Sequence, residues 1–459
     1  MPPLSLASYY QLPPALRPNI GSGINPVSAA PTLVPDVAAS ADTPATEAEN
    51  NSKTAPSSKP DDAAAKHDEH WRRSLSLDTR YWPGTYSNRA AGNGGYEFFD
   101  LLALPVDLLT DHTGAGGTLL GRTAYFLGGT VWMTYMASPW ITAYHEFGHG
   151  SRYAALDSDH IQFGTFKFAA DGVETHPVSG VIDLYAYLLT HPDQSGAYTE
   201  GPFYMQNGHA SRNDVIVGTG GVNNSMNMAE IVEDRSYNHG ADVQMYMPYI
   251  MAKLDAAEYA QNEAMGFQGD LTWVEDYYHQ QGYNISNLGI GMAGLGSLLL
   301  SSSFYNLAAS SGLYIVKGDT TMHAWEVKGV RLPDVDFYLT SQGLSYKLKS
   351  GYRVNEHLAF PVAYEQVFAG DTSAFEVHPQ VQGELVNGHV GAELTAGPLI
   401  GSGGFGFDVD ATLHAGRFLV GVGLIQFDRD TLYGERNTPD LTSGDDLAYE
   451  SWVKLGLQY

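Results

Sequence analysis

Residues 145–149 read His-Glu-Phe-Gly-His, and these residue types at this spacing suit hydrolysis at a metal ion. On an α-helix, His145 and His149 lie one turn apart on the same face, so both imidazoles can bind one zinc ion at about 2.0–2.1 Å. Glu146 then faces the open position on the ion, where it can take a proton from bound water. The sequence therefore predicts Zn²⁺ held by His145 and His149, with Glu146 as the general base.

The residues around this motif favour a buried helix. Residues 140–144, Trp-Ile-Thr-Ala-Tyr, are largely apolar, and Gly148 allows another backbone to approach the helix closely. The alternative is a helix whose two histidines only satisfy polar neighbours.

A zinc site needs a further ligand, and the chain has no cysteine, so the ligand must be a histidine or a carboxylate. The metzincin extension is excluded, because Arg152 and Ala155 stand where that family has Gly and His. Another part of the chain must complete the site.

Glu230 and Asp234 are the predicted partners of the two histidines. Together with the first motif, this pair resembles the gluzincin metallopeptidases, in which a ligand Glu is followed four residues later by an Asp. The resemblance covers only residues 145–149 and 230–234. It implies Glu230 as the third ligand and Asp234 as the acceptor that orients a ligand imidazole; Glu233 is an alternative ligand. It also implies a catalytic role for His239, as a group that stabilises the oxyanion.

A second comparison is with the site-2 intramembrane proteases, whose related motif lies in an apolar helix, as residues 123–149 do here. This sequence lacks their later Asp-Gly motif with its upstream Asn-Pro. Residues 123–144 and 285–316 carry no charge and are long enough to span a bilayer. Their Gly, Ser and Thr content, and Pro139 in the first, are equally compatible with helices buried in protein.

The composition limits the possible partners. The chain has 51 acidic and 24 basic side chains among 459 residues, which argues against a nucleic-acid partner. Residues 26–70 are rich in Ala, Pro, Ser and Thr, so we expect a disordered leader or linker over residues 1–80. An α-rich metallopeptidase-like domain is expected over residues 81–316.

From about Thr321 the apolar residues alternate with period two, which predicts a C-terminal antiparallel β-barrel over residues 317–459 and an α+β fold overall. The last run alternates from Tyr449 and ends on the aromatic Tyr459. It resembles the terminal strand of bacterial outer-membrane β-barrels. That resemblance implies a lipid bilayer as partner and an outer-membrane location; a soluble barrel, and the inner membrane or periplasm, are the alternatives.

These observations together predict a membrane-associated zinc metalloendopeptidase that acts on a peptide or protein substrate. The alternative from another class is a non-catalytic outer-membrane barrel protein with a helical plug or adaptor, in which the metal site is incidental or structural. Metal content discriminates between these two.

Overall fold

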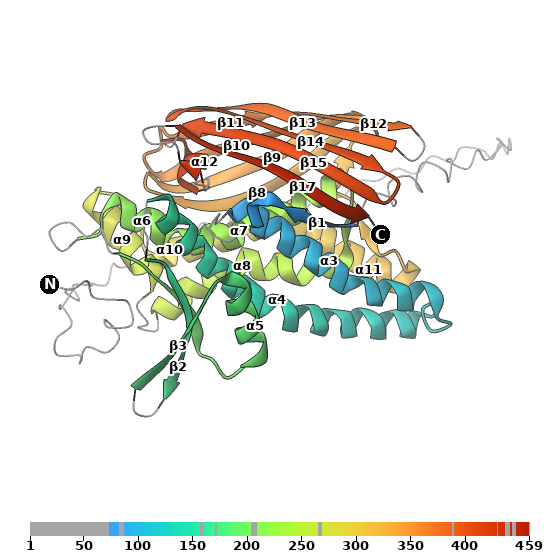
Figure 1. Cartoon of the computed structure of the whole chain (residues 1–459), viewed down its shortest axis with the longest axis horizontal. Helices are drawn as coiled ribbons and strands as arrows, with labels where there is room; N and C mark the ends of the chain where they lie inside the picture. The colour runs from blue at the N-terminus through green and yellow to red at the C-terminus, as the bar shows by residue number, and fades with distance from the viewer. Residues whose placement is uncertain are drawn as a thin grey trace, which may run out of the picture.

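A computed structural model describes residues 73–81, 87–156, 160–169, 172–202, 209–264, 269–387, 390–428, 430–436, 441–442 and 447–458. The fold is α+β, as predicted: a layer of helices lies against one side of a large antiparallel sheet, and the hairpin β2–β3 projects from the opposite side of the helices (Figure 1). Residues 1–72 of the predicted leader, and Tyr459, lie outside the described residues.

The helical part extends from residue 88 to residue 317. Its helices are α3 (Asn88–His112), α4 (Leu119–Ala155), α5 (Val181–Thr190), α6 (Arg212–Gly218), α7 (Gly220–Asn238), α8 (Tyr246–Ala264), α9 (Asp270–Gln280), α10 (Asn287–Leu300) and α11 (Ser302–Lys317). A small sheet, in the order β3-β2-β4, joins β2 (Gln162–Ala169), β3 (Gly172–Val178) and β4 (Gly196–Glu200).

Helix α4 is the central helix of this part, and its C-terminal half is buried. Its first turn is capped by Thr118, whose hydroxyl accepts a hydrogen bond from the Gly121 amide. Trp140 packs edge-on against the ring of Phe99 from α3 and stacks with Tyr144, one turn along its own helix. The segment around the His-Glu motif is therefore a buried helix, as the sequence predicts.

The two uncharged stretches become helices of this layer. Residues 123–144 belong to α4, and residues 285–316 form α10 and α11. Among the helices that the structure describes, none is by itself both long and apolar enough to cross a membrane. α10 and α11 meet those criteria only as a pair, and they are bent by 54° at the break between them.

The large sheet has twelve strands in the order β1-β17-β15-β14-β13-β11-β10-β9-β8-β7, with β12 and β16 pairing beside this path. Within the described residues, no pairing joins β1 to β7. The strands are β1 (Ser74–Asp78), β7 (Glu326–Val327), β8 (Val330–Thr340), β9 (Gly343–Asn355), β10 (Leu358–Gly370), β11 (Phe375–Pro379), β12 (Val381–Asn387), β13 (Val390–Gly401), β14 (Gly404–Ala415), β15 (Phe418–Asp428), β16 (Leu441–Thr442) and β17 (Leu447–Gln458).

Strand β1 corrects the predicted boundary at residue 80. Ser74 pairs with Gln458 and Leu75 with Leu457, so part of the expected leader is an edge strand of the sheet. Five residues that follow a long polar segment carry too short an alternation to be recognised as a strand from sequence.

The two faces of the sheet differ in chemistry. Charged side chains such as Lys347, Glu365 and Asp408 point inward and are buried. Many outward apolar side chains are between 37% and 77% exposed; they include Leu75, Leu77, Leu348, Tyr352, Val354, Phe360, Val362, Tyr364, Phe368, Phe375, Val381, Leu385, Val390, Leu394, Ile400, Phe405, Leu413, Phe418, Val420, Val422, Leu424, Tyr449, Val453, Leu455 and Leu457. The exposed apolar face distinguishes this sheet from a soluble β-sandwich, whose outward residues are polar.

Buried ion pairs join the helices to the inner face of the sheet. Lys253 of α8 is fully buried and its Nζ lies 2.6 Å from Asp336 of β8 and 3.1 Å from Glu233 of α7. Lys349 of β9 lies 2.9 Å from the same Glu233 carboxylate. Because an unpaired buried charge is costly, these contacts fix α7 and α8 relative to the sheet.

Candidate metal centre

Two histidines and one aspartate meet at one point in the helical part. Asp270 Oδ2 lies 3.0 Å from His149 Nε2 and 3.4 Å from His145 Nε2. One ligand atom from each of the three residues lies within 4.8 Å of the other two. Both histidines are nearly inaccessible to solvent, and the Asp270 side chain is 21% exposed. The donors come from the C-terminal half of α4 and the first residue of α9.

The remaining ring nitrogens are held by other groups. His145 Nδ1 lies 2.8 Å from Asp255 Oδ2 of α8, and His149 Nδ1 lies 2.7 Å from the Val217 carbonyl oxygen, to which it donates. A metal-binding histidine usually donates its other N–H to a carboxylate or a carbonyl in this way, which leaves Nε2 available for the ion. Tyr259 stacks flat on the His145 ring, with centroids 4.4 Å apart.

These donors fit a zinc ion. Bonds of about 2.0–2.1 Å in a tetrahedral site place the ligand atoms about 3.3 Å apart, and the two distances to Asp270 bracket that value. Two imidazoles and one carboxylate are also a usual donor set of catalytic zinc, which keeps its fourth position open. The residues present are thus able to hold the predicted metal.

Glu146 lies beside the three donors and is almost completely buried. Its Oε2 accepts a hydrogen bond of 2.9 Å from the Thr199 hydroxyl of β4, which also donates to the Glu146 carbonyl oxygen at 2.8 Å. This pair of bonds ties the carboxylate to both its own helix and the neighbouring strand. Glu146 is therefore held beside the cluster by Thr199, and it is not one of the three residues whose ligand atoms converge.

The charges of the site depend strongly on one another. Burial lowers the pKa of His145, but the carboxylates of Asp255 and Asp270 outweigh this effect and raise the pKa well above its ordinary value. Burial raises the pKa of Glu146 and would raise that of Asp270, but the two histidines hold the Asp270 pKa well below its usual range. The buried carboxylates of Asp255 and Glu146 and the partly exposed one of Asp270, around two imidazoles, create a negative pocket that favours a cation.

A close approach of two helices shapes this site, and it confirms the interpretation of Gly148. A Cβ on Gly148 would lie 2.2 Å from the carbonyl oxygen of Gly220 in α7, and a Cβ on Gly221 would lie 2.1 Å from His145 Nε2. Only glycine can occupy such positions without displacing the backbone or the ligand. The first turn of α7 therefore packs directly against the turn of α4 that carries His145 and His149.

The structure does not bring Glu230 or Asp234 to the histidines. Glu230 follows Gly221 by nine residues, which is about 13 Å along a helix with 1.5 Å rise per residue. It binds the Lys347 ammonium and the Tyr338 hydroxyl instead. Asp234 lies 3.3 Å from Arg331. The four-residue spacing of Glu230 and Asp234 thus places both carboxylates on the face of α7 that pairs with basic side chains of the sheet. Asp270, and not Glu230, lies beside the two histidines.

The alternative ligand Glu233 also lies elsewhere. It accepts hydrogen bonds from Tyr249 at 3.0 Å and Ser301 at 2.9 Å, beside Lys253. Asp255, and not Asp234, makes the contact with a histidine ring that was predicted for Asp234.

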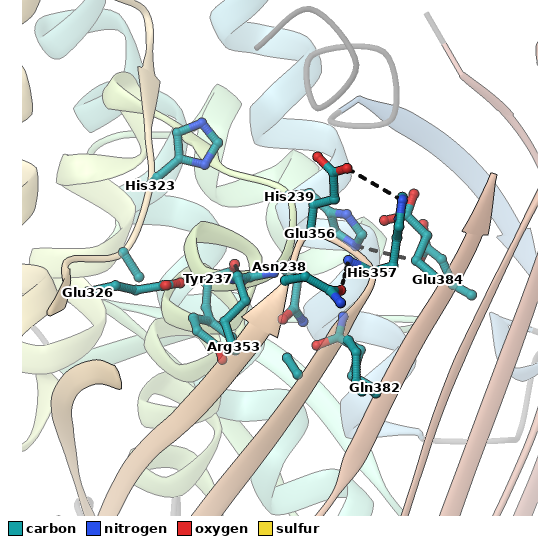
Figure 2. A pocket seen from close by; sticks show the side chains of 15 residues that line it. Tyr237, Asn238, His239, His323, Glu326, Arg353, Glu356, His357, Gln382 and Glu384 are labelled. Atoms are coloured by element: carbon teal, nitrogen blue, oxygen red, sulfur yellow. Dashed lines mark hydrogen bonds and ion pairs between the residues drawn. The ribbon is translucent and has the colours of Figure 1, made fainter. Parts of the chain in front are cut away.

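His239 caps the C-terminal end of α7 and belongs to a different cavity. Figure 2 shows this cavity of about 300 Å³, which His239 lines together with Arg353 of β9 and Glu384 of β12. His239 Nε2 lies 3.6 Å from Glu393. Because none of the three metal donors lines this cavity, the structure does not support the predicted oxyanion role of His239.

The metal donors lie in a separate cleft of about 530 Å³. It is lined by His145, Glu146, His149 and Asp270 together with residues of α4, α8 and the β2-β3-β4 sheet. The cleft is large enough for several residues of a bound chain.

Sequence reasoning missed Asp270 and Asp255. Asp270 lies in the first turn of α9, where an acidic residue is common because it interacts favourably with the helix dipole. Such a residue therefore gives no separate signal of metal binding. Asp255 follows Lys253 by two residues in α8, and only the packing of α8 against α4 brings it to His145.

Comparison with protein-family models, curated proteins and solved structures gives no match for this chain. The donors, their spacing and the cleft around them are therefore the only indications of function in the described residues.

Replacing Asp255 by Asn is expected to weaken zinc binding about 10- to 100-fold, the usual cost of losing a partner that orients a ligand imidazole. The variant keeps the side-chain volume but removes the charge that holds His145 Nδ1. Competition with a chelating dye measures the affinity. Asp276→Asn, at a more exposed carboxylate of the same helix as Asp270, is the matched control. Equal zinc affinity in Asp255→Asn and the wild type would contradict this role.

Proposed function

We propose that this chain is a membrane-associated zinc endopeptidase in which His145, His149 and Asp270 hold the metal and Glu146 is the general base. The observation that carries the proposal is the convergence of the two Nε2 atoms and the Asp270 carboxylate beside Glu146 in one cleft. A zinc ion there would polarise a peptide carbonyl and lower the pKa of water.

The side chains of the site divide the work of hydrolysis. Asp255 and the Val217 carbonyl hold the two imidazoles in the tautomer that leaves Nε2 free. Thr199 fixes the Glu146 carboxylate at the cleft. Glu146 takes a proton from the attacking water and later delivers it to the leaving amine.

A strand edge beside the general base supports a peptide as substrate. β4 is at one end of the order β3-β2-β4, and its residues 196–199 line the cleft. An extended peptide can add to such an edge through main-chain hydrogen bonds, which suits cleavage within a chain.

The large sheet supports association with a membrane. Its exposed side chains are largely apolar, and its buried side carries charged groups such as Lys347, Glu365 and Asp408 beside apolar ones such as Ile425 and Phe427. Apolar side chains outside and polar ones inside are the alternation of strands in a transmembrane β-barrel. We therefore propose that the sheet belongs to a barrel-like wall in contact with lipid, in the bacterial outer membrane.

The second candidate, a non-catalytic barrel protein with a helical plug, is favoured by one observation: buried ion pairs such as Lys253–Asp336 hold the helices to the inner face of the sheet. A plug of this kind does not need a metal site inside a cleft. Metal content and hydrolysis therefore decide between the two candidates.

Protein purified in detergent without chelator is expected to contain close to one zinc ion per chain. A chelator should abolish the hydrolysis of quenched fluorescent peptides, and added Zn²⁺ should restore it. Elemental analysis and peptide fluorescence measure the two properties. Protein that folds but holds no stoichiometric transition metal would rule out the proposed peptidase.

A further inference from the structure

One face of α4 leads from the molecular surface to the metal donors. Counting back from His149 in steps of three or four residues gives His145, Thr142, Ser138, Tyr135, Val131 and Leu127. Residues at these spacings lie on the same side of a helix. The C-terminal four line the cleft. Tyr135, Val131 and Leu127 are exposed, by 52%, 71% and 57%.

This exposed end is part of a larger apolar surface of α4. Leu119, Leu120 and Trp132 are also exposed, by 58%, 81% and 43%. Single exposed apolar residues are ordinary, but a group of six on one half of a helix indicates a surface that contacts lipid or protein. Because the outward face of the large sheet is apolar as well, a lipid bilayer is the contact that explains both surfaces.

The lining of the cleft combines apolar walls with carboxylates and disfavours an acidic chain. None of the described residues that line it is Lys or Arg. Asp255 is held by His145, so Glu258 is the one remaining carboxylate of the lining outside the proposed metal and base residues. The apolar side chains of the lining include Ile141, Val217, Met251 and Leu254 from helices and Phe166, Phe168 and Val173 from the β2–β3 hairpin. Such walls favour apolar side chains and disfavour acidic ones.

We propose that the substrate is an apolar segment of a polypeptide held in a lipid bilayer, and that it reaches the cleft along the face of α4 between Leu127 and Ser138. This inference rests on the proposed zinc peptidase and names its substrate class. The exposed apolar face of α4 is the path by which the segment enters, and the apolar lining of the cleft selects apolar segments over acidic ones.

The test uses the Glu146→Gln protein loaded with zinc and reconstituted in phosphatidylcholine vesicles, so that binding is measured without turnover. Two fluorescent peptides of equal length serve as probes: a leucine-rich peptide that partitions into the vesicles, and a soluble one in which alternate leucines are glutamates. We expect the leucine-rich peptide to bind at least about tenfold more tightly, a difference of about 1.4 kcal/mol.

The route is tested with Val131→Lys in the same background. It should weaken binding of the leucine-rich peptide about tenfold, equivalent to 1.4 kcal/mol, because it places a charge on the path. Leu288→Lys is the matched control, since Leu288 of α10 is 73% exposed and does not line the cleft. It should leave binding unchanged.

Three outcomes overturn the inference: equal binding of the two peptides, binding of neither, or the same loss from both lysine variants. In each case the zinc content measured on the same samples shows whether the proposed peptidase still stands. Absence of zinc would instead remove the proposed function itself.

Discussion

Replacing Glu146 by Gln is expected to abolish peptide hydrolysis while zinc stays bound. Glutamine keeps the volume of the side chain and can still accept the hydrogen bond from Thr199, but it cannot take a proton from water. Loss of a general base costs roughly 10²- to 10⁴-fold in rate. We expect a loss in that range in kcat, measured with quenched fluorescent peptides, with one zinc per chain retained by elemental analysis.

Thr199→Val is the control for this variant. It removes the hydroxyl that positions the carboxylate but keeps the base, so we expect a smaller loss of kcat than in Glu146→Gln. A wild-type rate in Glu146→Gln, measured on a peptide that the chelated enzyme does not cleave, would show that another group supplies the base.

The second large effect is expected from Asp270, in contrast to Glu230. Asp270→Asn should weaken zinc binding by more than about 100-fold, beyond the cost of losing a partner that only orients a ligand. Glu230→Gln should leave zinc affinity unchanged. It should instead lower the free energy of unfolding by roughly 1–3 kcal/mol, because Lys347 loses its charged partner.

Zinc affinity and denaturant unfolding measured on both variants separate the two roles. Unchanged metal retention in Asp270→Asn would remove Asp270 from the site. Loss of zinc in Glu230→Gln, without loss of stability, would favour the ligand set that the sequence resemblance implies over the one in the structure.

The local part of the site was predictable from sequence. The spacing of His145 and His149 fixes their common face once the segment is a helix, and the apolar residues before them indicate that the helix is buried. The close packing at Gly148 was also predictable, because a glycine inside a buried helical motif indicates that another backbone approaches there. The block of strands after residue 317 was predictable because an alternation of period two persists over many residues.

The rest depends on contacts between distant segments. Asp270 is far from His149 in sequence, and an acid at the start of a helix is too common to indicate a ligand. Glu230 and Asp234 show a helix-face spacing that fits a metal site and also fits a layer of lysines and arginines. Which of the two applies depends on the element that this face of α7 packs against. The partners Lys347 and Arg331 lie on strands β9 and β8, whose packing against α7 was not predicted from the sequence.

The pairing of β1 with β17 affects when, during synthesis and folding, the cluster of His145, His149 and Asp270 can form. β1 precedes the helical part of residues 88–317, whereas its partner β17 follows it, so the strand stays unpaired while the helical part emerges. The Ser76 amide of β1 donates to Glu97 of α3 at 2.7 Å, which links the completed sheet to the helices around α4. Contacts between such distant segments form slowly. Under the proposed outer-membrane location and peptidase activity, we therefore expect a newly made chain to be exported before the proposed metal centre is complete.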